Sequence, residues 1–153
     1  MGAALFYHLT RRPLEATLPA LLEKALGQGW RVAVRGTDER RMEWLDERLW
    51  MGEGFLPHAR AGSGFDGDQP VLLTTAVVDA ANGATCLMAV DGAEVTSGEA
   101  QRLDRVCILF DGNDTGAVER ARGQWRVLTG AGVPAQYWSE ESGRWQMKAE
   151  SGG

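Results

Sequence analysis

The chain has 153 residues, 44% of them hydrophobic and 24% charged, which is the size and composition of one ordinary globular domain. Its 16 basic and 21 acidic residues give a net charge of −5, and this balance disfavours a protein that binds nucleic acid through bulk positive charge. No apolar run approaches the roughly 18 residues of a membrane-spanning helix, and the N-terminus lacks the basic start and long apolar stretch of a signal peptide.

Strand-like and helix-like patterns alternate along the chain. Short apolar runs predict strands at 3–9, 30–34, 70–75, 85–90 and 105–110, followed by two short terminal strands at 133–139 and 144–148. Amphipathic spacing predicts helices at 14–26, 37–50 and 115–129, with a shorter helix within 91–103. Pro19 falls about one turn into the first helical pattern, so we expect that helix to begin near it.

This alternation predicts an α/β fold: a three-layer α/β/α single domain with a mostly parallel, mixed central sheet. The strand at 105–110, RVCILF, is the most apolar and is expected near the centre of the sheet. A helix between the strands at 3–9 and 30–34 favours parallel pairing of these two strands. We expect the domain to span 1–148, with a flexible tail at 149–153.

The cysteines and histidines indicate no catalytic group, metal or cofactor. Cys86 and Cys107 each lie inside an apolar run, which indicates two buried, reduced thiols in a cytoplasmic protein. A Cys–His nucleophilic pair would need a thiol that this mid-strand position makes inert. His8 and His58 have no second His, Cys or carboxylate at metal-binding spacing.

Residues 62–67, GSGFDG, match the G-x-G-x-x-G pattern of dinucleotide-binding loops. Such a loop needs a strand before it and a helix after it, because the pyrophosphate rests on the helix N-terminus. Here a Pro-His loop precedes the glycines and a strand follows them. We interpret the segment as a flexible connection, and the alternative is a small α/β nucleotide-binding protein or enzyme that uses it.

Residues 45–64, LDERLWMGEGFLPHARAGSG, join the end of a helix to a loop with several large apolar groups. These groups are Trp50, Met51, Phe55 and Leu56. Either the loop folds back onto the core, as large apolar side chains usually do, or it displays a hydrophobic patch to a partner.

The helix predicted at 115–129 carries a basic stripe. Arg122 and Arg126 are four residues apart and therefore lie on one face, with Val118 and Trp125 beside them. A basic stripe bordered by an aromatic group suits a short peptide with acidic and apolar groups, especially one that ends in a carboxylate. The alternative is a solvated basic face over a core tryptophan.

Over nearly its whole length the chain resembles the chi subunit of bacterial DNA polymerase III. The resemblance is carried by the AALFYHL strand, by LDERLW and GFLPH, and by ARGQWRVLTGAG in the last long helix, while residues 77–98 match only loosely. It implies an α/β protein without catalytic activity that belongs to the clamp-loader assembly. The family links that assembly to single-stranded DNA-binding protein, whose acidic C-terminal tail, ending in phenylalanine, it holds.

By position, the resemblance places the tail-binding arginine at Arg122, the aromatic groove residue at Trp125 and a further basic position at Arg126. Val118 stands where the family has another basic residue. The interface to the psi subunit, or to another clamp-loader subunit, falls on Trp50, Phe55, Leu56, Pro57 and His58. We therefore expect the protein to bind a DNA-binding protein, and neither DNA nor a membrane. Direct binding of single-stranded DNA through the arginines and the tryptophan is a competing hypothesis.

Overall fold

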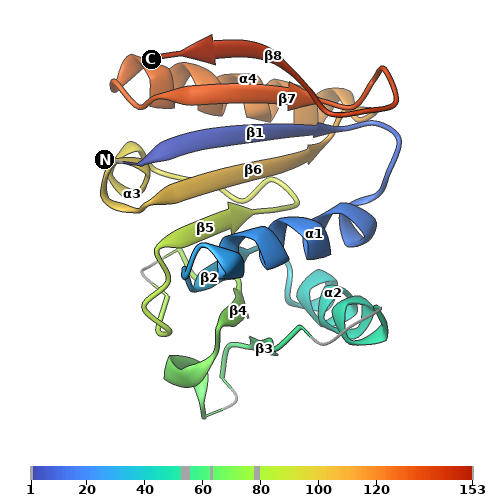
Figure 1. The fold of residues 1–153 in the computed structure, drawn as a ribbon, viewed down its shortest axis with the longest axis vertical. Coiled ribbons are helices and arrows are strands. Elements are labelled where there is room, and N and C mark those ends of the chain that lie inside the picture. The colour runs from blue at the N-terminus through green and yellow to red at the C-terminus, as the bar shows by residue number, and fades with distance from the viewer. Residues whose placement is uncertain (1, 53–55, 63, 78–79, 153) are drawn as a thin grey trace.

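A computed structural model of the protein describes residues 2–52, 56–62, 64–77 and 80–152, with an eight-stranded sheet between two layers of helices (Figure 1). The strands are β1 (Ala3–Leu9), β2 (Val32–Arg35), β3 (Ala59–Arg60), β4 (Val71–Thr74), β5 (Cys86–Ala89), β6 (Arg105–Asp111), β7 (Ala135–Ser139) and β8 (Gln146–Ser151). The helices are α1 (Leu14–Gly27), α2 (Glu39–Met51), α3 (Ser97–Arg102) and α4 (Thr115–Gly130), with a short 3₁₀ helix, η1, at Asp66–Asp68. The predicted α/β/α architecture is confirmed.

The strand order is β3-β4-β2-β5-β6-β1-β7-β8, and all of these pairings are parallel except that of β7 with β8. β6 lies inside the sheet, between β5 and β1, as its apolar sequence predicts. The predicted pairing of the first two strands is wrong, because β5 and β6 lie between β1 and β2. The βαβ spacing sets the direction of two strands, but it leaves room for strands that come later in the chain.

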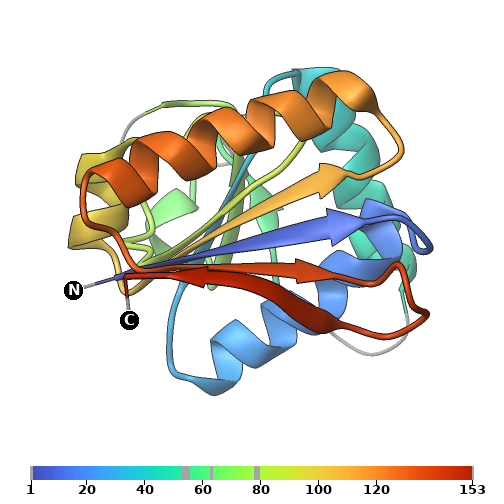
Figure 2. The ribbon, with the colours of Figure 1, turned by 90° about the horizontal axis from the view of Figure 1, so that it is seen from above.

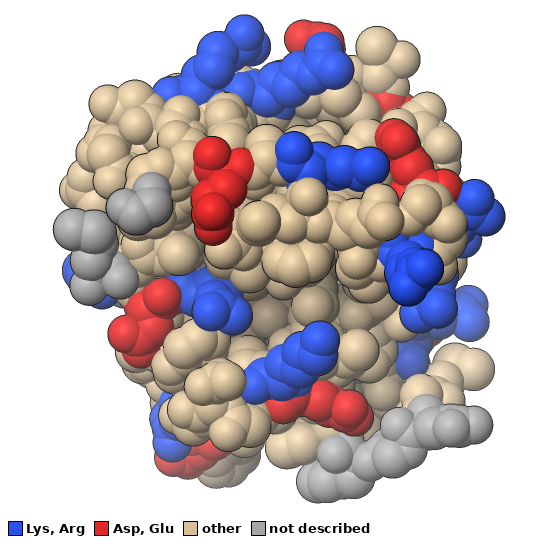
Figure 3. Space-filling view, turned by 45° about the horizontal axis from the view of Figure 1, so that its top comes forward, with Lys and Arg blue, Asp and Glu red and all other residues tan. Residues whose placement is uncertain are grey.

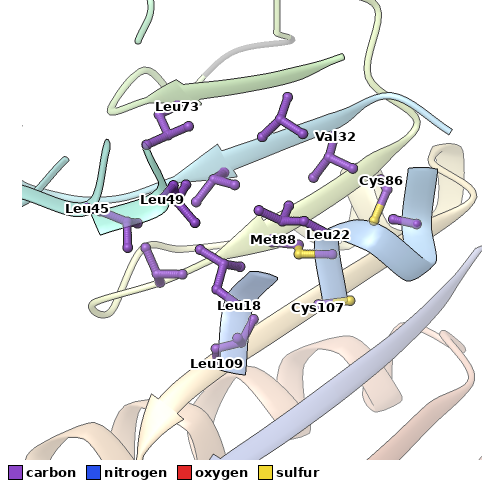
Figure 4. Packing of buried hydrophobic residues seen from close by; sticks show 14 of the residues in the cluster. Leu18, Leu22, Val32, Leu45, Leu49, Leu73, Cys86, Met88, Cys107 and Leu109 are labelled. Atoms are coloured by element: carbon purple, nitrogen blue, oxygen red, sulfur yellow. The ribbon is translucent and has the colours of Figure 1, made fainter. Parts of the chain in front are cut away.

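Each face of the sheet has its own core. Leu5 of β1 packs with α1 and α2, whereas the next residue, Phe6, packs with α3 and α4. Figure 2 shows α1 and α4 on opposite sides of the sheet. In the first core, Leu22 of α1 lies over Met88 and the two cysteine side chains (Figure 4). The alternation along β1 therefore serves two helix layers, as expected for a strand that is covered on both faces.

α1 begins at Leu14 and contains Pro19, so our prediction that it begins near the proline is wrong. The proline removes one backbone N–H from the second turn. Leu18 and Leu22, both fully buried, hold the helix against the sheet on either side of it. Tertiary packing here outweighs the local cost of the proline.

The sheet continues beyond the predicted domain boundary. Ala149 and Ser151 of β8 pair with Tyr137 and Ala135 of β7, so residues 149–151 are strand where we expected a flexible tail. β8 is an exposed edge strand with few apolar residues, and its sequence therefore carries little strand pattern. It forms because β7 offers it backbone hydrogen-bonding partners. β3 and η1 were also not predicted, because two or three residues are too few to show a period.

Candidate functional site

α4 carries the basic stripe and covers one side of the sheet next to β1 and β7 (Figure 2). Its first turn is fixed by Asp114, whose carboxylate accepts hydrogen bonds from the N–H groups of Gly116 and Ala117. It ends before Gly132, whose φ of 84° favours glycine. Ala121 and Leu128 are buried against the sheet, and this orientation leaves the arginines of the stripe on the outside.

Trp125 is half-buried at the edge of the core. Its ring lies edge-on to Phe6 of β1, with centroids 5.3 Å apart and planes at 65°. It also lies 6.1 Å from the ring of Tyr137 on β7, at 76°. Both arrangements are of the edge-to-face kind that aromatic pairs favour. The tryptophan is therefore held by the core on one side and accessible on the other.

Arg122 is exposed and lies one helical turn from Trp125. Its guanidinium Nη1 is 3.3 Å from the Glu119 carboxylate, an ion pair within the helix whose two side chains are 65% and 60% exposed. Burial raises the pKa of Tyr137, the positive charge of Arg122 lowers it, and the negative charge of Glu141 raises it. A carboxylate ligand can compete for this arginine, because so exposed an ion pair is weak.

The other two predicted residues complete the stripe. Val118 is half-buried against the α4-side core, and Arg126 is exposed. In the part of the chain that the structure describes, Arg126 makes no ion pair. The predicted residues Val118, Arg122, Trp125 and Arg126 thus share one side of α4. Lys and Arg side chains gather over this helix at the top of Figure 3.

Sequence reasoning missed two residues of this surface, His8 and Tyr137. The Tyr137 hydroxyl lies 2.9 Å from Nδ1 of His8, and both rings pack on Phe110. Neighbouring parallel strands bring them together: β1 pairs with β7 so that Phe6 faces Tyr137. The adjacent aromatic residues Tyr137 and Trp138 in the strand predicted at 133–139 were a usable signal, but only the strand order shows where the tyrosine points.

The predicted patch at the end of α2 is partly displayed and partly buried. Trp50 and Met51 are 52% and 73% exposed, and the Trp50 ring lies 4.2 Å from that of His58. Leu56 is buried and Pro57 half-buried. Phe55 lies outside the described residues. The patch therefore presents the tryptophan and the methionine, while residues 56–58 pack inward.

His58 supports the patch from inside. Its ring is buried, with Nδ1 2.7 Å from the Leu56 carbonyl oxygen and Nε2 3.1 Å from an Asp46 carboxylate oxygen. These contacts join the loop after α2 to the helix itself. The histidine thus holds the position of Trp50 and is not itself on the surface.

A cavity of about 680 Å³ opens at the carboxyl ends of the parallel strands, where α/β folds often bind nucleotides. Three groups of backbone donors around it already have carboxylate partners. Glu140 accepts hydrogen bonds of 3.0–3.2 Å from the N–H groups of Thr10, Arg11 and Arg12, which follow β1. Asp38 and Asp114 likewise cap α2 and α4. At these three places a carboxylate of the chain already occupies the position in which the N–H groups would bind a phosphate.

The glycine segment at 62–67 also lacks the context of a nucleotide site. η1 and then β4 follow it, in place of the long helix that the motif requires. The Asp66 carboxylate accepts a hydrogen bond from the Gly62 N–H. Among the described residues, no three His, Cys, Asp or Glu side chains are grouped to hold a metal.

The two thiols are buried and unoxidised, as predicted. A hydrogen bond with Cys86, together with burial, raises the pKa of the Cys107 thiol. A thiol that resists ionisation is a poor nucleophile.

The fold and these surfaces define a small α/β protein with two candidate interaction surfaces: a basic, aromatic face of α4 and an apolar patch at the end of α2. The family model of the DNA polymerase III chi subunit, HolC, matches residues 1–136. The chain therefore belongs to the DNA polymerase III chi subunit family, which is a family of accessory replication subunits, and the resemblance noted from its sequence is confirmed. No curated protein matches the chain. No helix in the described ranges is long and apolar enough to cross a membrane.

Proposed function

We propose that the protein is a non-catalytic subunit of the clamp-loader complex of DNA polymerase III, and that it links this complex to single-stranded DNA-binding protein in the cytoplasm. The link is made by holding the acidic C-terminal tail of the DNA-binding protein. One observation carries the proposal: Arg122 and Trp125 lie next to each other on the accessible side of α4, with the tryptophan anchored on Phe6.

Each part of the α4 surface has a partner in the tail. The Arg122 guanidinium pairs with the carboxylate at the end of the tail, since Arg binds carboxylates with two parallel hydrogen bonds. Trp125 offers its accessible edge to the terminal phenylalanine ring. Arg126 attracts the acidic residues before it, and Val118 adds apolar contact where the family has a positive charge.

The patch at the end of α2 serves a second partner, the psi subunit or another clamp-loader subunit. Trp50 and Met51 give it the exposed apolar area that such contacts use. Phe55, Leu56, Pro57 and His58 belong to the same segment, and the buried His58 holds it in place. The α4 surface and the patch lie on different helices, so one chain has a separate surface for each partner.

Direct binding of single-stranded DNA through the α4 surface is the second candidate. The observation in its favour is the pairing of exposed arginines with a tryptophan on which bases can stack. The net charge of −5 and the Glu119 carboxylate beside Arg122 oppose it. The affinity of a nucleic-acid complex would fall steeply as the salt concentration rises. The affinity of a tail complex would depend in addition on the terminal phenylalanine of the tail.

Fluorescence anisotropy of a labelled tail peptide, titrated with the protein, tests the proposal. We expect saturable binding that is lost when the terminal phenylalanine is removed. An unlabelled tail peptide should displace the labelled one, whereas an oligothymidine should not. No binding at about 100 μM protein, equivalent to roughly −5.5 kcal/mol, would contradict the proposed function, and displacement by oligothymidine alone would favour the second candidate.

A further inference from the structure

The α4 surface continues onto Tyr137 of β7. This residue lies just beyond residues 1–136, the range of the family match. Its ring meets those of Trp125 at 6.1 Å and Phe110 at 5.9 Å. Because Phe6 and Phe110 are buried and the other two rings only half-buried, Trp125 and Tyr137 form the accessible end of a continuous aromatic cluster.

His8 fixes the position of the Tyr137 hydroxyl. The imidazole stacks on Phe110, with centroids 5.2 Å apart, and its Nδ1 lies 2.9 Å from the phenol oxygen. The opposite edge of the ring packs against Gly112 so closely that a Cβ on this glycine would lie 2.0 Å from Nε2. The His8 Nε2 is accordingly buried and has no hydrogen-bond partner.

The packing of His8 determines which group donates the hydrogen bond between His8 and Tyr137. A neutral imidazole has one N–H donor and one acceptor nitrogen. Buried N–H groups without an acceptor are rarer than buried acceptors without a donor. The proton therefore belongs on Nδ1 of His8, which donates to the Tyr137 oxygen. The phenol proton is not used in this bond and is free for another acceptor.

The acceptor that suits this free donor is an anion. Arg122 lies one turn of α4 before Trp125, whose ring contacts that of Tyr137, so one carboxylate can reach both the guanidinium and the phenol. Glu141 of the hairpin has a carboxylate oxygen 4.0 Å from the His8 Nδ1, and its negative charge also acts on the phenol. Within the described residues, the Tyr137 hydroxyl has no hydrogen bond to this carboxylate. The donor is therefore available to a ligand.

We propose that Tyr137 is a specificity-determining residue for the end of the tail. Its hydroxyl donates a hydrogen bond to the terminal carboxylate that Arg122 pairs with, and the terminal ring packs against the accessible sides of Trp125 and Tyr137. This inference rests on the proposed function, and it adds recognition of the free carboxylate at the chain end to recognition of the phenylalanine.

Two peptides and two variants test it. The tail peptide is made with a free C-terminal carboxylate and with a C-terminal amide, and both are titrated against the unaltered protein and Tyr137→Phe. We expect Tyr137→Phe to weaken the free-acid peptide about tenfold and the amide peptide less than about threefold, because hydrogen bonds to charged groups are the stronger ones. Trp138→Phe is the matched control, because adjacent residues of a strand face opposite sides of the sheet, and it should bind both peptides as the unaltered protein does.

The outcomes separate the two proposals. Equal weakening of both peptides, or none, by Tyr137→Phe would overturn the role of Tyr137 while leaving the tail-binding function intact. Failure of the unaltered protein to bind either peptide would overturn the proposed function and this inference with it. Tyr137→Phe keeps the ring, and an unchanged thermal unfolding midpoint would show that the cluster is intact.

Discussion

The α4 surface and the patch at the end of α2 each expose a tryptophan, but the two side chains stand in different surroundings. Trp125 is half-buried against Phe6 and has Arg122 and Arg126 beside it. Trp50 is 52% exposed, has the exposed Met51 as its neighbour and rests on the buried ring of His58. The first surface combines charge with an aromatic edge and suits a carboxylate-bearing peptide. The second is apolar and suits the apolar surface of another subunit.

The supports of the two tryptophans differ as well. Trp125 rests on a hydrophobic core that the whole sheet stabilises. Trp50 stacks on His58, whose ring nitrogens hydrogen-bond the backbone carbonyls of Leu56 in its own loop and of Asp46 in α2. We therefore expect the α4 surface to tolerate surface substitutions that change only binding, and the patch to depend on the buried His58.

The largest expected effect is the loss of stability when the buried His58 is removed. His58→Ala removes a buried ring together with its hydrogen bonds, and should lower the free energy of unfolding by about 3 kcal/mol. Denaturant unfolding followed by circular dichroism measures the change. Trp50→Ala is the control, and should cost about 1 kcal/mol because half of its surface is already in water. If Trp50→Ala unfolds the protein, the assignment of Trp50 to the surface is wrong.

The next largest effect is expected when the positive charge of Arg122 is removed. Arg122→Ala should weaken tail binding by roughly 1.5–3 kcal/mol, the usual contribution of a charge-assisted hydrogen bond, and leave the fold intact. Arg120→Ala is a matched control, because Arg120 lies on the same helix but packs towards Gly92. Peptide anisotropy measures both. Equal losses in the two variants would mean that the helix attracts the tail only through its overall charge.

A smaller effect is expected at Glu140, which ties the β7–β8 hairpin to the loop after β1. Burial raises the pKa of this carboxyl, but the N–H groups of Thr10, Arg11 and Arg12 hold it below its ordinary value. A pKa that is lower in the folded state means stability that is present above the unfolded pKa and lost as the pH falls through the folded one.

Glu140→Gln should therefore lower the free energy of unfolding by about 1 kcal/mol at neutral pH, with the difference shrinking below about pH 4. Unfolding curves at several pH values measure this, and Glu141→Gln on the exposed side of the hairpin is the control. A difference that stays constant down to low pH would show that the Glu140 charge plays no part.

The smallest expected effect is at Glu119, whose carboxylate occupies Arg122 in the free protein. Glu119→Gln releases the arginine and should strengthen tail binding by about twofold or less, as expected for an exposed pair within a helix. Binding of a partner to the patch at the end of α2 should not change in this variant. Weaker tail binding by this variant would indicate that the ion pair positions the arginine for the ligand.

The sequence predicted the layers of the fold but not its strand order. Amphipathic spacing indicated α2 and α4, and the apolar sequence of β6 indicated its central place, because these signals are local. Pro19 misled the prediction for α1, since the packing of Leu18 and Leu22 is a tertiary effect. β8 carries almost no pattern of its own and is set by its neighbour.

In the candidate site, too, local spacing was predictable and contacts between distant segments were not. Arg122, Trp125 and Arg126 share one helix face, so their spacing was enough to group them. Tyr137 and His8 come from two strands that are far apart in the sequence, and only the pairing of β1 with β7 joins them to the α4 surface. The burial of His58 likewise depends on a loop folding back over α2.

The most direct test of tail binding at the proposed α4 surface uses the indole N–H signals of the six tryptophans in a ¹⁵N-labelled sample. The signals of Trp125 and Trp50 are assigned with Trp125→Phe and Trp50→Phe, and the tail peptide is then added. We expect the Trp125 signal to shift progressively to saturation while the Trp50 signal stays in place. A shift at Trp50 with none at Trp125 would contradict this expectation, and would place the tail at the end of α2.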